Sequence, residues 1–348
     1  MKILVTGGAG FIGANFVRWL LERDGRLYPV EQITVLDALT YAGNIQNLEG
    51  LEDHKNFYFV KGNICDADFV SQLLGENSFD AVLNFAAESH VDRSIVDPLA
   101  FVRTNVEGTQ ILLEAARRAN VSRFLQVSTD EVYGSLGETG RFTETSPIQP
   151  SSAYSASKTA GDLLALAAHT THGYDVVVTR CSNNYGPLQF PEKFMPLVIT
   201  NAMNDEPLPL YGDGKNVRSW LHVDDHARAL MLVLTKGQAG EVYNIGGAPE
   251  SEKENISVLK EILALLGKPE SLIKYVEDRK GHDRRYAVDF TKIQNELGWQ
   301  PEVSFSDGLK ETVEWYRKNQ SWWTAVKSGA YQDFYAQYYG NRLKVVGV

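Results

Sequence analysis

A tyrosine and a lysine four residues apart are the first candidates for chemistry in this sequence. Tyr154 and Lys158 would share one face of a helix, because residues at positions i and i+4 are neighbours there. A free tyrosine titrates near pKa ~10, too high for a base at neutral pH, but a neighbouring ammonium group favours the phenolate. The pair, with Ser128 and Thr129 upstream at the end of an apolar run, predicts that Tyr154 acts as a base.

A glycine-rich turn near the N-terminus predicts a dinucleotide site. Gly8, Gly10 and Gly13 fit the pattern G-x-G-x-x-G between an apolar run at 3–5 and a helical stretch. Glycine lets the backbone approach a pyrophosphate, which then binds the unpaired N–H groups of the helix N-terminus. The expected cofactor contacts of this loop are Gly7, Gly10, Phe11, Ile12 and Gly13.

Asp37 ends the second apolar run, at 33–36. A carboxylate there accepts hydrogen bonds from a ribose 2′-hydroxyl and repels a 2′-phosphate. No basic residue lies within 37–41, so the sequence predicts NAD as the cofactor rather than NADP. Ligands of open α/β sheets bind at the ends of such runs, which adds as cofactor contacts Ala38, Leu39, Thr40, Asn63, Ile64, Phe85, Ala86 and Ala87.

A parallel sheet is needed to bring these residues together. Apolar runs at 3–5, 33–36, 57–60, 81–85, 124–127 and 176–178 alternate with stretches of helical period. Such runs are typical of strands buried on both faces of a parallel sheet. We therefore predict an α/β fold, with a Rossmann-type doubly wound parallel sheet and a smaller, mixed α/β substrate-binding domain.

The domain boundary is expected near residue 186, where prolines and glycines begin to cluster. We predict an NAD-binding domain at 1–185, with a return segment near 221–245, and a substrate-binding domain at 186–348. The aromatic tail, from Trp322 to Tyr339, is expected to pack onto the body of the protein.

The composition excludes several classes of protein. The 348 residues include 34 Lys and Arg against 44 Asp and Glu, a net charge of −10. An acidic chain of this kind is a poor candidate for binding nucleic acid or an anionic membrane, and no apolar run approaches roughly 18 residues. Two cysteines, Cys65 and Cys181, without a Cys/His cluster indicate neither a disulfide framework nor a metal site. We expect a cytoplasmic protein.

Around these residues the chain resembles the extended short-chain dehydrogenase/reductase family over essentially its whole length. Within that family it is most similar to the nucleotide-sugar 4,6-dehydratases. The motifs that carry the resemblance are TDEVYG at 129–134, AESHVDRS at 87–94, DALTYAGN at 37–44, SNNYGP at 182–187 and GHDRRY at 281–286. The adjacent Asp130 and Glu131 distinguish the dehydratases from the related sugar epimerases, which eliminate no water and generally lack such a pair.

The resemblance implies NAD-dependent dehydration of dTDP-glucose to dTDP-4-keto-6-deoxyglucose in deoxysugar biosynthesis. Tyr154, assisted by Thr129 and Lys158, would take the 4-hydroxyl proton during oxidation of C4. Glu131 would then remove the C5 proton, and protonated Asp130 would donate to the departing 6-hydroxyl. Repulsion within the pair helps to push one of the two pKa values upward.

The resemblance also implies which residues hold the ligands. It adds Ser89, Thr104, Tyr154, Lys158 and Asn184 as cofactor contacts. The basic residues Lys193, Arg218 and Arg279 would clamp the diphosphate, for which arginine offers bidentate geometry. The implied substrate contacts are Ser89, His90, Thr129, Asp130, Glu131, Asn183, Lys193, Phe194, Pro209, Tyr211, Arg218, Asn255, Arg279 and His282.

Two positions depart from the family pattern. Lys280 replaces a usual proline, and Asn63 replaces a usual aspartate. The family is usually a homodimer joined through a four-helix bundle, which the helices around 101–119 and 154–169 would supply, with Leu163, Leu164 and Leu166 on the contact face.

Two other functions remain open from the sequence. The chain could be a 4,6-dehydratase for a UDP-linked hexose, or a catalytically silent NAD-binding sensor. The sensor is disfavoured because it would need the dinucleotide loop alone, whereas Tyr154, Lys158, Asp130 and Glu131 occur together.

Overall fold

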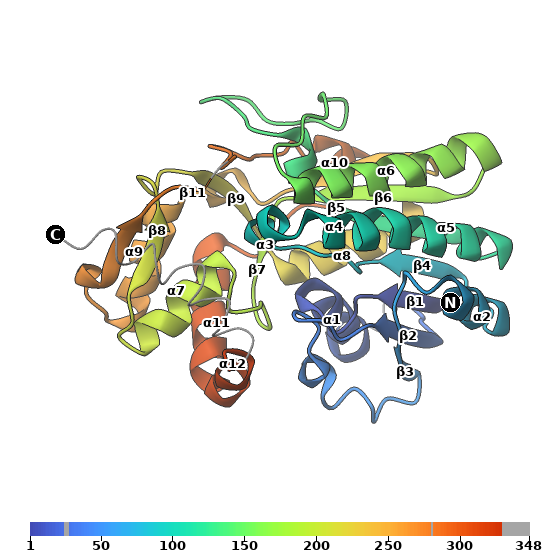
Figure 1. Ribbon diagram of the computed structural model, residues 1–348, viewed down its shortest axis with the longest axis horizontal. Coiled ribbons are helices and arrows are strands. Elements are labelled where there is room, and N and C mark those ends of the chain that lie inside the picture. Colours follow the sequence, from blue (N-terminus) through green and yellow to red (C-terminus); the bar gives the residue numbers. More distant parts are fainter. Residues whose placement is uncertain (24–27, 280, 329–348) are drawn as a thin grey trace.

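The computed structural model of the protein describes residues 1–23, 28–279 and 281–328 (Figure 1). The strands are β1 (Lys2–Thr6), β2 (Gln32–Asp37), β3 (Phe57–Lys61), β4 (Ala81–Asn84), β5 (Arg123–Thr129), β6 (Val176–Cys181), β7 (Asn183–Tyr185), β8 (Leu208–Tyr211), β9 (Val217–His222), β10 (Val242–Ile245), β11 (Glu252–Glu254) and β12 (Ile273–Val276). The α-helices are α1 (Phe11–Arg18), α2 (Ala67–Glu76), α3 (Val91–Val96), α4 (Pro98–Val102), α5 (Thr109–Arg118), α6 (Ala153–His172), α7 (Phe194–Met203), α8 (Val223–Lys236), α9 (Asn255–Leu266), α10 (Thr291–Leu297), α11 (Phe305–Lys318) and α12 (Gln320–Val326). Shorter helical segments are η1 (Trp19–Arg23), η2 (Ile45–Leu48), η3 (Arg103–Gly108), η4 (Asp130–Tyr133), η5 (Pro249–Ser251) and η6 (Glu270–Leu272).

A parallel sheet forms the centre of the larger lobe, with strand order β10-β6-β5-β4-β1-β2-β3. The chain proceeds from β1 to β2 and β3 on one side, and then through β4, β5 and β6 on the other. The strand order therefore reverses beside β1, where open α/β sheets bind their ligands. This sheet confirms the predicted doubly wound α/β fold.

The apolar runs are strands because both of their faces are buried. Ile3 and Val5 pack into one hydrophobic core, whereas Leu4 between them packs into a second core on the opposite face. Side chains alternate in the same way along β4 and β6, as expected for a strand period of two. Helices α1 and α8 contribute to the first core, and α2, α5 and α6 to the second.

A smaller lobe lies at one end of the sheet, at the left in Figure 1. Its hydrophobic core joins α7, α9 and α11 to strands β8 and β9. Two short sheets, β11-β9-β7 and β12-β8, complete this lobe. Helix α8 and strand β10 lie between its segments in the sequence but pack on the large sheet.

The beginning of the aromatic tail packs onto both lobes. Trp323 is buried in the smaller lobe, and Trp322 packs against the first core of the larger lobe and the core of the smaller one. The rest of the predicted aromatic tail, at 329–339, lies outside the described residues, as does Lys280. Within the described ranges, none of the helices is both long and apolar enough to cross a membrane.

A buried ion pair connects α6 to the sheet. Arg180 on β6 donates its Nε–H to Asp162 Oδ2 at 3.0 Å, and the two side chains are 2% and 0% exposed. Arg180 Nη1 also donates to the hydroxyl of Tyr133, which donates to Asn244 Oδ1 on β10. Because α6 carries Tyr154 and Lys158, this network fixes both of these residues relative to the strands.

We expect Arg180→Met to destabilise the protein, because it leaves the Asp162 carboxylate buried without its cation. The loss in free energy of unfolding should be about 3–5 kcal/mol, measured by urea denaturation. Arg118→Met is the control, since Arg118 pairs with Glu114 on the surface of α5. Equal losses in the two variants would show that the buried pair has no special role.

Candidate active site at the carboxyl ends of the strands

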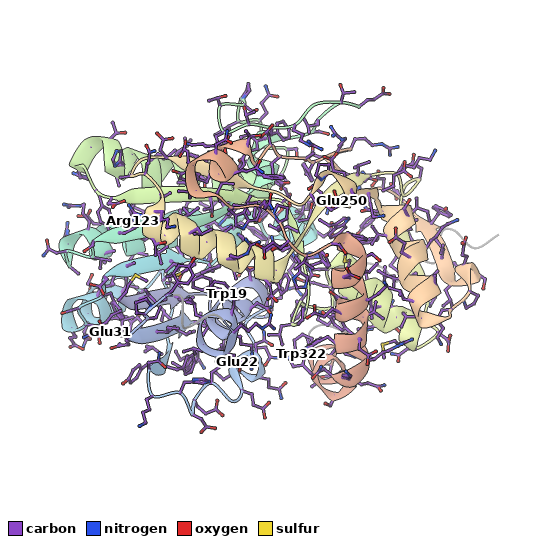
Figure 2. The ribbon with its side chains drawn as sticks, turned by 180° about the vertical axis from the view of Figure 1, so that it is seen from behind. Trp19, Glu22, Glu31, Arg123, Glu250 and Trp322 are labelled. Atoms are coloured by element: carbon purple, nitrogen blue, oxygen red, sulfur yellow. The ribbon has the colours of Figure 1, made fainter. Side chains whose placement is uncertain are left out.

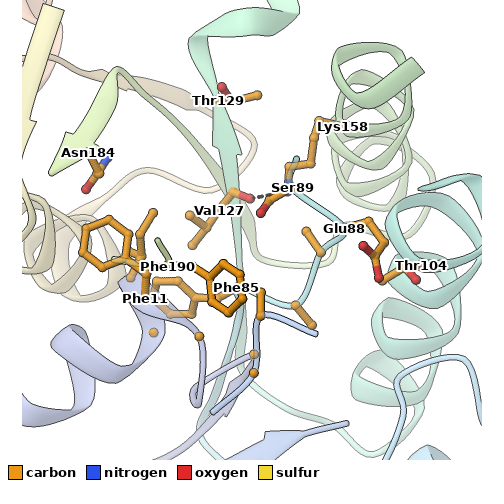
Figure 3. Close-up of a pocket in the computed structure, with 18 of the residues that line it drawn as sticks. Phe11, Phe85, Glu88, Ser89, Thr104, Val127, Thr129, Lys158, Asn184 and Phe190 are labelled. Atoms are coloured by element: carbon orange, nitrogen blue, oxygen red, sulfur yellow. Dashed lines mark hydrogen bonds between the residues drawn. The ribbon is translucent and has the colours of Figure 1, made fainter. Parts of the chain in front are cut away.

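One pocket gathers most of the residues predicted from the sequence. It lies at the carboxyl ends of the central strands, with Phe11 and Phe85 toward one end and Thr129 and Lys158 toward the other (Figure 3). The predicted residues that line it are Gly7, Gly10, Phe11, Ile12, Gly13, Asp37, Ala38, Thr40, Asn63, Ile64, Phe85, Ala86, Ala87, Ser89, Thr104, Thr129, Asp130, Glu131, Tyr154, Lys158, Asn183, Asn184 and Lys193.

The glycine-rich loop packs so closely against the residues after β4 and against itself that there is no room for a Cβ atom at two of its positions. Gly7 has a left-handed backbone, with φ 68°, and a Cβ atom there would lie 2.6 Å from the nitrogen of Ala86. A Cβ atom on Gly13 would lie 2.5 Å from the carbonyl oxygen of Gly7. Helix α1 starts directly after Gly10 without a side-chain cap. Its first N–H groups therefore suit an anion such as a pyrophosphate.

Asp37 is held at the end of β2 by two backbone donors. Its Oδ2 accepts from the N–H of Ala9 at 2.9 Å, and its Oδ1 accepts from the N–H of Leu39 at 2.8 Å. Burial raises the pKa of Asp37, and these two hydrogen bonds oppose the rise. The carboxylate lines the pocket and has further lone pairs for ribose hydroxyls. The glycine-rich loop and this acceptor fit a dinucleotide.

Leu39 differs from the prediction. Its backbone is left-handed, with φ 52°, and its side chain packs against the first hydrophobic core instead of lining the pocket. The turn that brings its N–H onto Asp37 rotates the side chain away from the predicted cofactor position.

The two adjacent acids lie in η4, immediately after β5. Thr129 caps this turn, because its hydroxyl oxygen accepts from the N–H of Glu131 at 3.3 Å. The same hydroxyl lies 3.4 Å from Asp130 Oδ1. Asp130 is 1% exposed, and burial, followed by the charge of Glu131, raises its pKa to about 8. Burial and the neighbouring charge therefore both favour the protonated form of Asp130.

Glu131 has a different electrostatic environment. Burial raises its pKa, but the charges of Arg279, Arg218 and Lys193 act in the opposite direction. The cations favour the ionised form of Glu131 against desolvation, whereas the charge of Glu131 adds to desolvation in favouring the protonated form of Asp130. One acid can therefore donate a proton where the other can accept one.

Tyr154 and Lys158 lie on α6, which Ser152 and Ser155 cap reciprocally. Burial and then the charge of Glu131 raise the pKa of Tyr154 well above its ordinary value, whereas a hydrogen bond with Thr129 opposes the rise. Lys158 donates Nζ–H to the carbonyl of Val127 at 2.7 Å, and burial lowers its pKa. Desolvation thus raises the pKa of Tyr154, in the direction opposite to the one expected from a neighbouring ammonium group.

Eight predicted substrate residues lie outside the described lining of this pocket: His90, Phe194, Pro209, Tyr211, Arg218, Asn255, Arg279 and His282. Phe194 begins α7 and stacks on Trp220, Pro209 lies within β8, and Asn255 begins α9. His90 is buried and its pKa is well below the usual range, because of burial and then the charges of Lys193, Arg93 and Arg279.

The predicted clamp residues lie around the acids. Arg218 on β9 donates to the carbonyl groups of Val217 and Asp283, and its guanidinium lies 4.3 Å from the ring centroid of Tyr286. Arg279 Nη1 lies 3.7 Å from Asp92 Oδ1. Both arginines belong to segments of the smaller lobe, yet their charges act on Glu131 of the larger lobe.

Asp92, which contacts Arg279, also connects this clamp to Tyr211 and His282. Asp92 on α3 accepts from the hydroxyl of Tyr211 at 3.1 Å, and Tyr211 packs edge-on to His282. Burial, then the charges of Arg279 and Arg218, lower the pKa of His282 to about 4.

Sequence reasoning missed the segment that closes the pocket from the smaller lobe. Gln189, Phe190 and Glu192 line the pocket, and Phe190 packs edge-on to Tyr41 from the turn after β2. Their nearness to the SNNYGP motif was the available signal. Their contacts with residues distant in sequence carry no local pattern.

Comparisons with known proteins show which family the chain belongs to. A family model described as GDP-mannose 4,6 dehydratase matches residues 4–312. A dTDP-glucose 4,6-dehydratase of Streptomyces niveus is 55% identical over 94% of this chain and 96% of its own. A protein of the same name from Streptomyces griseus is 58% identical over 92% of this chain and 95% of its own.

A solved structure is also similar. DesIV, a dTDP-glucose 4,6-dehydratase from Streptomyces venezuelae solved with NAD and TDP bound, has a TM-score of 0.91 and 52% sequence identity. The match covers 94% of this chain and 100% of DesIV.

The raised pKa of Asp130 predicts a pH-dependent effect on stability. The folded state binds this proton more tightly than the unfolded state, so the contribution of Asp130 to the free energy of unfolding falls as the pH rises from 3.8 to about 8. Asparagine has no such proton. The melting temperature of Asp130→Asn minus that of the wild type should therefore increase with pH up to about 8 and stay constant above that pH.

The control for this measurement is Asp53→Asn, which removes one negative charge from an exposed loop. If the difference between Asp130→Asn and wild type stays constant across the pH range, Asp130 is not protonated at neutral pH in the folded protein.

Proposed function

Since the chain belongs to the GDP-mannose 4,6-dehydratase family and groups with its dTDP-glucose 4,6-dehydratases, we propose that it converts dTDP-glucose to dTDP-4-keto-6-deoxyglucose. The reaction removes water, so the protein is a lyase. The observation that carries the proposal is the placement of Asp130 and Glu131 beside Tyr154 in one pocket, with the charges of three cations acting on Glu131. A dinucleotide sensor would have no use for such a pair.

The cofactor is NAD. The loop from Gly7 to Gly13 would hold its pyrophosphate, and Asp37 would accept hydrogen bonds from the adenosine ribose. When bound, NAD takes a hydride from C4 of the sugar and returns it to C6, so that it ends unchanged. Lys158, whose ammonium lines the pocket, would hold the other ribose.

The protein residues supply the proton transfers. Tyr154 takes the proton of the 4-hydroxyl, and Thr129 donates a hydrogen bond to the same oxygen as C4 becomes a ketone. The ketone acidifies C5–H, which Glu131 removes. Asp130 gives its proton to the 6-hydroxyl, which leaves as water when the C6–O bond breaks. Glu131 returns its proton to C5 during the final reduction. The proton that Tyr154 took from the 4-hydroxyl replaces, through solvent, the one that Asp130 lost, so that all three groups are reset for the next turnover.

Three cations would hold the nucleotide. Lys193, Arg218 and Arg279 provide positive charge beside the acids, in a protein with a net charge of −10. The guanidinium of Arg218 is fixed by two carbonyl groups and by Tyr286, so little side-chain entropy is lost when a diphosphate binds.

The chain also presents an apolar surface that fits a second copy of itself. Ile95, Val96, Leu99, Val102 and Leu163 are large hydrophobic residues, each 49% or more exposed, on α3, α4 and α6. These helices contact one another, and α4, α5 and α6 cover the face of the sheet turned to the viewer in Figure 1. Two such faces related by a twofold axis would make the four-helix bundle of a homodimer.

The face differs in detail from the one expected from the sequence. Phe101 is buried, and Leu166 packs against the second hydrophobic core. Leu163 is exposed, and the segment before residue 103 supplies the rest of the apolar surface, because α4 turns Phe101 inward and Leu99 and Val102 outward.

We expect Leu99→Glu to separate the dimer into monomers, because it buries a carboxylate in the apolar contact. Analytical ultracentrifugation of the purified protein measures the change. Tyr275→Glu is the control, since Tyr275 is a comparably exposed apolar residue, at 46%, in the smaller lobe. A wild-type protein that sediments as a monomer would refute the dimer.

Two variants test the reaction by separating the oxidation of C4 from the elimination of water. The wild-type protein should remove water from dTDP-glucose, seen by mass spectrometry, and act more slowly on UDP-glucose. Glu131→Gln should still oxidise C4 and accumulate reduced cofactor, while water loss falls by roughly 10²–10⁴-fold. Tyr154→Phe should abolish the absorbance of the reduced cofactor, because the first proton transfer is lost.

The contrast between the two variants is decisive. If folded, NAD-loaded Glu131→Gln also forms no reduced cofactor, the division of roles between Glu131 and Tyr154 is wrong. Equal turnover of UDP-glucose would instead revise the substrate and leave the chemistry in place.

A further inference from the structure

The C-terminal helices contact the dinucleotide loop through one intervening side chain. Trp322 on α12 donates its indole N–H to Asn47 Oδ1 at 2.9 Å. Asn47, in η2, donates its Nδ2–H to the carbonyl of Ala9 at 2.8 Å. Ala9 lies between Gly8 and Gly10 of the loop. In Figure 2, Trp322 lies on the side of the C-terminal helices that faces the N-terminal segment around Glu22.

These two hydrogen bonds fix the amide of Asn47 in one orientation. An indole N–H only donates and a carbonyl only accepts, so a rotated amide would oppose like groups at both ends. Asn47 is 2% exposed, so water does not replace the lost partners. Arg18 also donates to the carbonyl of Asn47 at 2.9 Å, which holds its backbone in place.

Ala9 connects the glycine-rich loop to Asp37, the carboxylate proposed to bind the ribose. Its N–H donates to Asp37 Oδ2 at 2.9 Å. Its carbonyl accepts from Asn47 Nδ2 and from the N–H of Asn44, at 2.8 and 3.1 Å. A rotation of this peptide would therefore move the groups proposed to bind pyrophosphate and ribose together.

Trp322 is itself fixed by both lobes. Its ring packs against the first core of the larger lobe and the core of the smaller one, and lies edge-on to Trp315 with ring centroids 5.1 Å apart. Tyr316 on the preceding helix α11 donates its hydroxyl to the carbonyl of Gln189, which lines the pocket. Helices α11 and α12 thus contact the glycine loop through Asn47, and the opposite wall of the pocket directly.

We infer that Trp322 and Asn47 are positioning residues for the cofactor. The indole orients the amide of Asn47. That amide holds Ala9, which lies between the glycines proposed to bind the pyrophosphate and the Asp37 carboxylate proposed to bind the ribose. Neither residue needs to touch the cofactor. The inference rests on the proposed binding of NAD to this loop, and it assigns part of that binding to the far end of the chain.

Trp322→Phe tests this link because it keeps an aromatic ring and removes only the N–H donor. We expect NAD to dissociate faster by roughly 2- to 10-fold, the factor that corresponds to one hydrogen bond, as followed by stopped-flow displacement. NAD affinity should fall by more than the kcat of the NAD-saturated enzyme. The matched control is Trp323→Phe, which removes an indole N–H from the same helix.

The control separates positioning from general loosening. The indole of Trp323 donates to the carbonyl of Tyr316 at 2.9 Å, within the C-terminal helices. Its loss should lower the melting temperature and leave NAD dissociation unchanged. If Trp323→Phe accelerates dissociation as much as Trp322→Phe does, the effect is only structural and the inference is overturned.

A second variant acts on the other side of the same hydrogen bond. Asn47→Asp can still accept from Trp322, but its carboxylate repels the carbonyl of Ala9, so NAD should dissociate faster still. Wild-type dissociation rates in both variants would overturn the inference while leaving the proposed function intact. A wild-type protein that neither binds NAD nor dehydrates dTDP-glucose would refute the proposed function itself.

Discussion

The desolvation of two adjacent carboxylates, one buried and one partly buried, is the constraint on which the rest of this structure depends. Asp130 and Glu131 follow a strand that is buried on both faces, and burial is the largest influence on the pKa of each. A buried negative charge costs several kcal/mol without compensation, and a second charge on the next residue adds repulsion. The protein meets this cost by favouring the protonated form of Asp130 and by directing positive charge at Glu131. The different preferences of the two acids thus follow from their desolvation and from the charges around them.

That positive charge explains why the larger lobe is insufficient alone. Lys193, Arg218 and Arg279 oppose the rise in the pKa of Glu131, and all three lie after the SNNYGP motif, where the chain enters the smaller lobe. Removing them would leave the desolvation of Glu131 less opposed, so its pKa would rise further and the base at C5 would be ionised less often. The cations proposed to bind the diphosphate therefore also set the charge of the catalytic base, so substrate binding and base strength are coupled.

Local patterns predicted the sheet and the loop because both depend on short-range rules. Strand residues that alternate between two cores must all be apolar, which makes continuous apolar runs in the sequence. A loop with no room for Cβ atoms requires glycine at positions 7 and 13. The expectation from charge alone, that a neighbouring ammonium lowers the pKa of Tyr154, was less reliable, since desolvation raises that pKa. Positions such as Gln189 and Trp322 escaped prediction, because their roles come from contacts with residues far away in sequence.

The chemistry explains why such distant contacts would converge on the dinucleotide loop. A cofactor that is reduced and reoxidised within one turnover need not leave the protein, so tight retention does not slow the reaction cycle. An enzyme that exchanges its cofactor has to balance affinity against release. Here the loop can be held from several sides: by Asp37 within the larger lobe and, through Asn47, by Trp322 near the last described residues. An immobilised cofactor keeps its nicotinamide ring within reach of both C4 and C6 of the sugar during the two hydride transfers. Asp130 and Glu131 act between these transfers.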